Sequence, residues 1–181
     1  MLALSAYMLA ARINSPGTRV TASVDKNETL DMVLYFLSED GAGLKPEERR
    51  LPATADRAGR IRQAVLELIK GPAGKGLLPV VPNGTALREA YFIEKEGRAY
   101  IDLSSDVSSR HWGGTTAEEC TIYAIVNTVL KNFVDVKSVQ FLIDGEVRET
   151  LAGHLDLRGP FRLKESLFAV ARREAADEEM P

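Results

Sequence analysis

Residues 136–157 of the chain read VKSVQFLIDGEVRETLAGHLDL, and this stretch decides the predicted fold. Between Val136 and Ile143 the apolar side chains fall at alternate positions, which predicts a strand with one buried face. Asp144-Gly145 is a two-residue turn sequence that favours positive φ, and residues Glu146 to Leu151 are predicted to return as the partner strand. The stretch therefore predicts a β-hairpin near the end of a domain.

Toward the N-terminus, apolar spacing predicts further helices and strands. Apolar residues three and four apart predict helices at 56–70 and 116–133. Alternating apolar residues predict strands at 30–36, 85–94 and 98–103, with a brief extended segment at 49–52. The resulting order predicts a mixed, largely antiparallel sheet. Each helix carries a single apolar stripe, so we expect a two-layer α/β sandwich with both helices on one face of that sheet.

The ends of the two helices carry recognisable signals. Gly71-Pro72 ends the first helix in the expected order of a glycine followed by a proline. Thr115 and Glu118 stand three residues apart and predict a capping box at the start of the second helix. Cys120 lies in the apolar stripe of that helix, so we interpret it as a buried, inert thiol.

Composition limits the classes of function. The chain has 181 residues, with 23 Lys and Arg against 26 Asp and Glu, for a formal net charge of −3. This balance argues against nucleic acid as a partner, because nucleic-acid affinity comes from clustered Lys and Arg. Cys120 is the only cysteine and there are two histidines, which excludes a disulfide within the chain, multi-cysteine zinc patterns and a three-histidine metal site. We predict no metal and no cofactor.

The chain divides into three predicted parts: an apolar arm and linker at 1–28, a domain at 29–162, and a helix with an acidic tail at 163–181. The apolar run Leu2 to Ala11 would span about 15 Å as a helix, half of a bilayer core. We interpret it as part of an export signal or membrane anchor whose beginning lies before Met1. A short helix packed on the domain is the alternative.

The chain resembles a GerMN domain, the module named for sporulation and spore-germination proteins of the GerM type. The resemblance covers residues 30–161 and rests on motifs in a fixed order, of which VKSVQFLIDGEVRETLAGHLDL is the most specific. The motifs before it are LYFLSEDGAGLKPEERRL (34–51), AVLELIKGP (64–72), VPNGTAL (81–87), AYIDLSSDV (99–107) and GGTTAEECTIYAIVNTV (113–129).

The resemblance implies a fold similar to ring-building motifs and an envelope-located accessory domain without established catalysis. Asp144, Gly145, Gly153, His154 and Asp156 form the signature of its closing segment. Two departures stand out. Many members carry a lipid-bearing cysteine near the start, whereas here no cysteine precedes position 120, and Ala152 replaces a glycine that commonly stands there. The chain holds one copy of the domain, whereas some members hold two.

A catalytic reading of the closing segment pairs His154 with Asp156, and with Ser104 or Ser105 as a nucleophile it describes a hydrolase. No glycine-flanked nucleophile elbow surrounds these serines. We therefore interpret His154 as structural, bonding nearby backbone and fixing the return of the hairpin.

Trp112 and His111 are the candidate interaction residues. Trp112 is the only tryptophan and lies in a polar loop bounded by glycines rather than on an apolar face. Tryptophan is enriched at interface hot spots, and loops often carry binding function. The alternative is that its ring folds over a sheet edge or the helix start. Gly113-Gly114 could cradle an anion through backbone amides, but a plain turn before the helix is the favoured reading.

These observations predict a non-enzymatic interaction or assembly module of the bacterial envelope, with a link to sporulation or germination. Its expected partner is an envelope protein or a second copy, and the N-terminal segment is a candidate membrane contact. A binding domain for cell-wall glycan or another small ligand is the alternative. A hydrolase using His154 and Asp156 ranks last.

Overall fold

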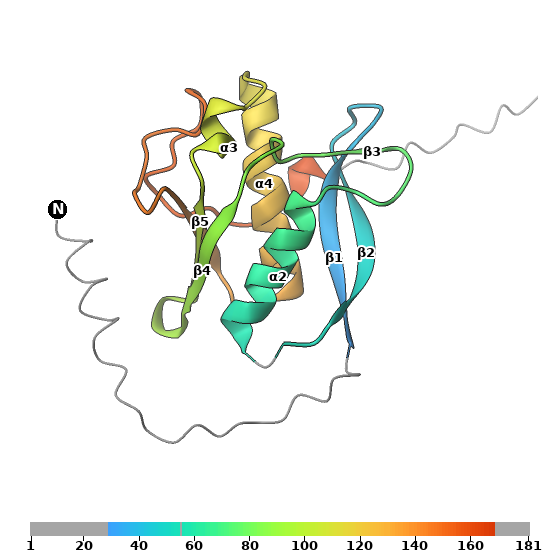
Figure 1. Ribbon diagram of the computed structural model, residues 1–181, viewed down its shortest axis with the longest axis vertical. Coiled ribbons are helices and arrows are strands. Elements are labelled where there is room, and N and C mark those ends of the chain that lie inside the picture. The colour runs from blue at the N-terminus through green and yellow to red at the C-terminus, as the bar shows by residue number, and fades with distance from the viewer. Residues whose placement is uncertain (1–28, 55, 169–181) are drawn as a thin grey trace, which may run out of the picture.

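Two helices lie between two small sheets in the computed structural model, which describes residues 29–54 and 56–168 (Figure 1). The first sheet has the order β2-β1-β3 and the second the order β4-β5-β6. The strands are β1 (Thr29–Ser38), β2 (Leu44–Pro52), β3 (Leu77–Leu78), β4 (Leu87–Ile93), β5 (Arg98–Leu103) and β6 (Ser138–Ile143). The helices are α2 (Arg57–Ile69), the single turn α3 (Asp106–Ser109) and α4 (Thr115–Asn132), with 3-10 turns at Glu94–Glu96 and Glu165–Leu167.

The first sheet is an antiparallel pair with a short third strand. β1 and β2 pair along their whole length, from Thr29 opposite Pro52 to Leu37 opposite Leu44. β3 joins only the end of β1, through Leu37 and Leu78. The remaining edge of β1 therefore has no strand beside it.

Side chains of α4 complete that edge of β1. The amide of Asn132 accepts a hydrogen bond from the Val33 N–H at 2.9 Å and donates one to the Val33 carbonyl at 2.7 Å. The hydroxyl of Thr128 accepts the Tyr35 N–H at 3.1 Å. Buried backbone groups need partners, and here one helix supplies them in place of a strand.

The second sheet mixes antiparallel and parallel pairing. β4 and β5 form the predicted antiparallel hairpin, which turns at Gly97 with a φ of 57°. β6 lies parallel to β5, with Arg98 opposite Ser138 and Leu103 opposite Ile143. A parallel pair needs a crossover, and α3 and α4 provide it.

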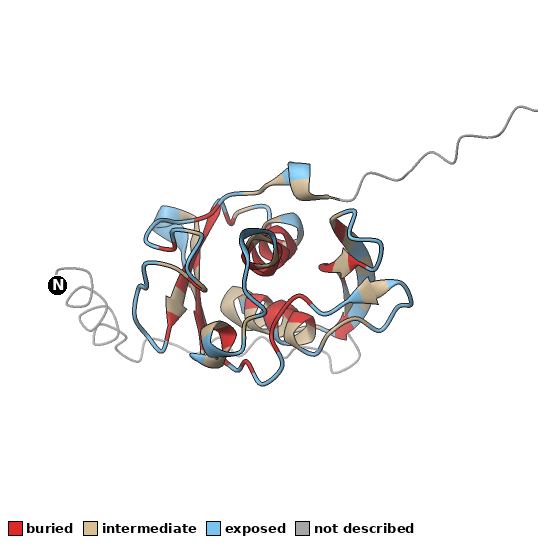
Figure 2. Ribbon diagram, turned by 90° about the horizontal axis from the view of Figure 1, so that it is seen from above, coloured by how far each residue is buried: buried red, intermediate tan, exposed pale blue. Residues whose placement is uncertain are grey.

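Both helices bury apolar side chains, but α4 is covered on more than one side (Figure 2). In α2 the buried residues form the single stripe Ile61, Ala64, Val65 and Leu68. In α4 the predicted stripe is buried from Cys120 to Val129, whereas its first member, Ala117, is partly buried, and Ile122 and Val126 outside that stripe are buried as well. The two helices therefore differ, because α2 keeps an exposed side that carries Leu66, which is 37% exposed.

The α/β class and the mixed, largely antiparallel pairing are therefore confirmed, whereas the single sheet is corrected to two sheets on opposite sides of the helices. The reason lies in β1. Its free edge meets polar side chains of α4, so it does not join β4, β5 and β6.

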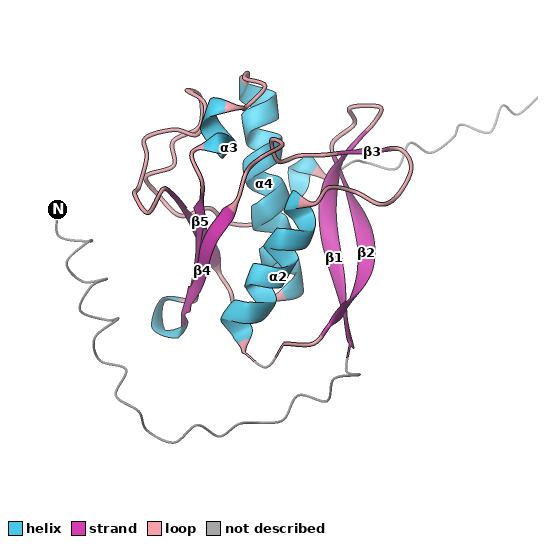
Figure 3. Ribbon diagram, in the orientation of Figure 1, coloured by secondary structure: helices cyan, strands magenta, loops and turns pink. Residues whose placement is uncertain are grey.

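The predicted return strand at 146–151 is also corrected, since this segment is drawn as loop in Figure 3. The turn itself forms as predicted, with φ of 53° at Asp144 and 81° at Gly145. Beyond a single bridge from Ile143 to Glu146 the chain leaves the sheet. The edge of β6 is taken instead by Phe161, whose N–H and carbonyl both bond Val139, at 2.7 and 2.9 Å. A return strand would have to displace Phe161 from Val139.

The remaining boundaries are close to the predictions. α2 and α4 match the predicted helices to within one residue at each end. β2 is longer than the predicted extension at 49–52, because it begins at Leu44 and continues through Pro46. Proline is tolerated on an edge strand, where its missing N–H would point to solvent. The predicted arm at 1–28 and the tail beyond Phe168 lie outside the described residues.

Candidate interaction site at the N-terminal end of α4

Two loops meet at the N-terminal end of α4: the loop 110–114 that enters the helix and the loop 150–156 near the end of the domain (Figure 1). The sequence predicted functional or signature residues in both loops, His111 and Trp112 in the first and Gly153, His154 and Asp156 in the second. The structure thus brings together two groups of candidates that stand about forty positions apart in the chain.

Glu118 in the first turn of α4 holds the loop 150–156 in place through hydrogen bonds. Its side chain is completely buried. One carboxylate oxygen accepts the N–H groups of Leu151 and Leu155 at 3.0 and 3.1 Å, and the other accepts the His154 N–H at 3.0 Å. Ring nitrogen Nδ1 of His154 contacts that second oxygen at 3.1 Å. One side chain therefore satisfies most of the inward-facing backbone donors of a loop that has no strand partner.

These contacts decide the ionisation of Glu118. Burial opposes the charged form and by itself raises the pKa. Hydrogen bonds from the backbone of Ala152, Leu155 and His154 and from the His154 ring favour the charged form, and together they leave the pKa below its usual value. Glu118 is thus an ionised carboxylate held by dipoles.

This arrangement corrects the predicted capping box. The N-cap of α4 is Gly114, with no side-chain cap, and Thr115 is already helical. Instead of capping the helix, the Glu118 carboxylate accepts the N–H groups of Leu151, His154 and Leu155. The sequence did contain a signal for this role: Glu118 lies in line with the buried Ile122 and Ile125, at helical spacings of four and seven residues.

His111 fixes the first loop, and its hydrogen bonds define its tautomer. The hydroxyl of Thr121 donates its only proton to the Val80 carbonyl at 2.6 Å. That hydroxyl must therefore accept from Nε2 of His111 at 3.1 Å, and Nδ1 accepts the Gly113 N–H at 3.1 Å. Both ring nitrogens are used by the neutral imidazole.

The electrostatic surroundings also favour the neutral form of His111. Burial is the largest effect and lowers the pKa of the ring. The negative charge of Glu118 opposes this by raising the pKa, and His154 lowers it. The two histidines of the chain thus share one buried carboxylate.

Trp112 projects from the loop that His111 holds. Its side chain is 60% exposed, and its ring meets the His111 ring edge-on with centroids 5.7 Å apart. Gly113 and Gly114 follow with φ of 78° and 85°, values that suit glycine. The Trp112 ring is therefore largely exposed to solvent, on a loop that His111 holds at its base.

The structure separates the residues of the catalytic reading. His154 faces Glu118, whereas Asp156 forms an ion pair with Arg158 at 2.8 Å. The side-chain hydrogen bond from Arg158 lowers the pKa of Asp156 to about 2. The hydroxyl of Ser104 bonds Asp106 at 3.3 Å and the Ala86 N–H at 3.0 Å. Across residues 29–54 and 56–168, no serine forms a hydrogen bond with His154.

Asp144 and Gly145 lie at a different junction, where β4 begins and β5 and β6 end. The Gly145 N–H bonds the carboxylate of Asp102 at 2.9 Å, and Arg88 bridges Asp102 and Asp144 at 3.2 and 3.3 Å. This half of the predicted signature therefore shapes the sheet ends. Asp102 is buried there, a role that the sequence did not predict.

Cys120 is buried, and burial raises the pKa of its thiol, with a smaller contribution from Glu119. Among the described residues, no three His, Cys, Asp or Glu side chains converge in a way that could hold a metal ion. Nor does any helix in that part of the chain have the length and apolar character needed to cross a bilayer.

Comparison with known proteins places this fold in a family. The family model Germane, described as sporulation and spore germination, matches residues 33–149. That range is 117 of the 181 residues, and the chain belongs to the Germane family. The resemblance to GerMN domains is confirmed. Comparison with curated proteins yields no match.

Solved structures support the same fold. A candidate lipoprotein from Clostridium perfringens is 26% identical, with a TM-score of 0.54, over 78% of this chain and 93% of that chain. The tandem GerMN domains of the sporulation protein GerM from Bacillus subtilis are 16% identical, with a TM-score of 0.62, over 75% of this chain and 46% of theirs. The first GerMN domain of GerM is 18% identical, with a TM-score of 0.56, over 76% and 98%.

Proposed function

We propose that this protein is a non-enzymatic interaction module of the bacterial cell envelope, with Trp112 at the centre of the contact surface. The single observation that carries the proposal is the 60% exposure of the Trp112 side chain on a loop anchored by hydrogen bonds. A large ring left in water on a fixed loop offers contact area at little entropic cost on binding. The partner is an envelope protein or a second copy of the chain.

The similar proteins support the location and the class. One is a candidate lipoprotein, and others are domains of a sporulation protein. A lipoprotein is attached to a membrane, which favours an envelope location for this chain, and the family description favours a link to sporulation or germination. The separation of His154, Asp156 and the serines favours a binding role over hydrolysis.

The exposed ring also favours a second candidate, a binding domain for cell-wall glycan. An aromatic side chain presents an apolar face beside polar groups, and here Thr115 and Thr116 at the start of α4 and His154 in the second loop are exposed. A sugar ring, with an apolar face and polar edges, complements such a surface.

Affinity capture from a native envelope extract distinguishes these candidates. The full chain, a Trp112→Ser variant and an Ile93→Ser control are immobilised. Ile93 is 39% exposed at the far end of β4, so its loss controls for general surface hydrophobicity. We expect one stoichiometric protein, or the chain itself, to be captured by the full chain and the control and to fall at least tenfold with Trp112→Ser. Equal capture by both variants contradicts the proposal, and loss of capture after glycan digestion of the extract favours the second candidate.

A further inference from the structure

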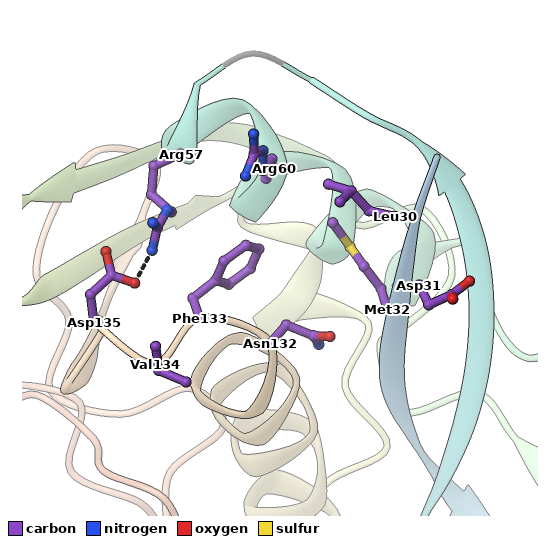
Figure 4. A pocket seen from close by; sticks show the side chains of 9 residues that line it. All are labelled: Leu30, Asp31, Met32, Arg57, Arg60, Asn132, Phe133, Val134 and Asp135. Atoms are coloured by element: carbon purple, nitrogen blue, oxygen red, sulfur yellow. Dashed lines mark hydrogen bonds and ion pairs between the residues drawn. The ribbon is translucent and has the colours of Figure 1, made fainter. Parts of the chain in front are cut away.

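A pocket of about 200 Å³ opens at the other end of α4, far along the helix from Trp112 (Figure 4). It lies between the start of β1, the first turns of α2 and the residues that follow α4. Pockets for drug-sized molecules are larger, roughly 300–1,000 Å³. The volume therefore suits a single small group or the end of a longer molecule.

The charged residues that line the pocket leave one positive charge without a partner. Asp135 forms an ion pair with Arg57, whose guanidinium also lies 5.8 Å from the centre of the Phe133 ring. Asp31 pairs with Arg50 at 2.9 Å. Both acids of the pocket are thus neutralised by arginines.

Arg60 is the cation that remains. Its Nε donates to the Thr54 carbonyl at 2.7 Å, and within residues 29–54 and 56–168 it makes no ion pair. The side chain is half-buried, so water screens its charge less than at a free surface. The hydroxyl of Thr54 is buried with no hydrogen-bond partner in the described part of the chain. Thr54 does not line the pocket, so the unused bonding capacity there is that of the two terminal nitrogens of Arg60, which have no hydrogen-bond partner within the described residues.

The opposite wall is apolar. Figure 4 shows Met32 and Leu30 on one side of Phe133 and Val134 on the other. Val134 is 84% exposed, the largest exposed fraction among the apolar side chains of the described residues. A ligand seated on this wall would cover the Val134 side chain and place its polar end toward Arg60.

We propose that this pocket binds a carboxylate carried on a short apolar group. Arg60 receives the carboxylate through its two terminal nitrogens, the geometry in which guanidinium and carboxylate match. Leu30 and Val134 contact the apolar stem. A free small acid and the C-terminal residue of a peptide share this chemistry. Because the pocket and the Trp112 surface lie at opposite ends of α4, this site is independent of the proposed function.

The test is a titration of the isotope-labelled full chain followed by two-dimensional NMR. The probes are N-acetyl-leucine, its carboxamide, and a hexapeptide that ends in leucine with a free carboxylate. We expect saturable shifts at Leu30, Phe133 and Val134, with a dissociation constant on the order of 1 mM for an acid of this size. The carboxamide should bind at least fivefold more weakly. A tighter affinity for the hexapeptide identifies a peptide terminus, and equal affinities identify a free acid as sufficient.

Arg60→Gln tests the assigned cation, with Arg62→Gln as its matched control. Arg62 is on the same helix but pairs with Glu89 outside the pocket. We expect Arg60→Gln to weaken acid binding at least fivefold and Arg62→Gln to leave it unchanged. The proposal is overturned if the acid and its amide bind the unmodified chain equally, or if no residue of the pocket shifts at 10-fold the expected constant. The comparison of the acid with its amide uses the unmodified chain, so it tests the proposal even if Arg60→Gln unfolds.

Discussion

At the scale of single residues, Glu118 shows how a buried charge can organise a loop. Backbone N–H groups of a loop cannot stay buried without acceptors. One ionised carboxylate supplies them for Leu151, His154 and Leu155, and it also meets the ring of His154. From the sequence, a polar residue such as Glu118 in the first turn of a helix is expected at the surface or as a cap. Its true partners lie in a loop more than thirty residues further along, and a local sequence pattern carries no information about that loop.

Glu118→Gln is predicted to destabilise the protein strongly. The glutamine amide replaces one acceptor oxygen with a donor that faces backbone N–H groups, which leaves buried donors unpaired at about 1–3 kcal/mol each. We expect the free energy of unfolding in urea to fall by about 3 kcal/mol. The neighbouring Glu119→Gln loses only a partly exposed ion pair with Lys164, so it should cost less than about 1 kcal/mol. Equal effects of the two changes would show that the loop does not depend on Glu118.

His111 predicts a pH dependence that can be assigned to one ring. Burial lowers its pKa in the folded chain from the usual value of 6.5. As the pH falls through this value, the unfolded chain takes up a proton that folded His111 resists, so the free energy of unfolding decreases until the pH reaches the lowered pKa of the folded state. Glu118 has a pKa below its usual 4.5 and stays ionised across this range.

The measurement compares urea unfolding at pH 7.5 and 5.5 for the full chain and for His111→Gln. The full chain should lose more stability between these pH values than the variant. Because Trp112 is the only tryptophan, its fluorescence reports directly on the loop that His111 holds. Protonation of Nδ1 would set a second donor against the Gly113 N–H. If both proteins lose the same stability over this interval, His111 is not the group that titrates.

At the scale of elements, α4 has two tasks that a single apolar stripe does not describe. It fills the space between two sheets, and it supplies hydrogen bonds to the open edge of β1. Asn132 makes both bonds that a strand residue would make to Val33. Hydrophobic periodicity identifies the buried positions of such a helix, but it does not reveal which polar side chain completes a sheet.

Removing the Asn132 amide is predicted to open that edge. Asn132→Ala leaves the Val33 N–H and carbonyl unpartnered in a partly buried position, and we expect a loss of about 2 kcal/mol in the free energy of unfolding. Amide hydrogen exchange at Val33 should rise at the same time, whereas Met32, which faces β2, should change less. Exchange at Val33 that is no faster than in the unmodified chain would contradict the assigned role.

At the scale of the whole molecule, local signals predicted most elements but not their assembly. The helix bounds, the β4–β5 hairpin and the positive φ at Asp144 and Gly145 all follow from short-range spacing and turn chemistry, and they are confirmed. The division into two sheets depends on which edge each strand presents to which neighbour. The edge of β6 is paired by Phe161, about twenty residues downstream. The residue pattern of β6 itself does not indicate which segment pairs with it.

The candidate site shows the same limit. The sequence singled out Trp112, His111 and His154, and the structure places all three around the start of α4. Glu118, which holds the loop of His154, is a polar residue in the first turn of a helix, where a capping role is the ordinary expectation. The interaction role of these two loops stays a prediction. Trp112 is the residue that tests it, because its side chain is 60% exposed.

The most direct test of the interaction surface uses the single tryptophan as a probe. Growth with 5-fluorotryptophan gives the full chain one fluorine resonance, from Trp112. We predict that this resonance shifts or broadens when detergent-solubilised envelope is added and remains sharp with cytosolic extract. The size of the change should rise in proportion to the amount of partner protein that the same chain captures. A resonance that stays unchanged while the complex forms would place the contact elsewhere and contradict the account.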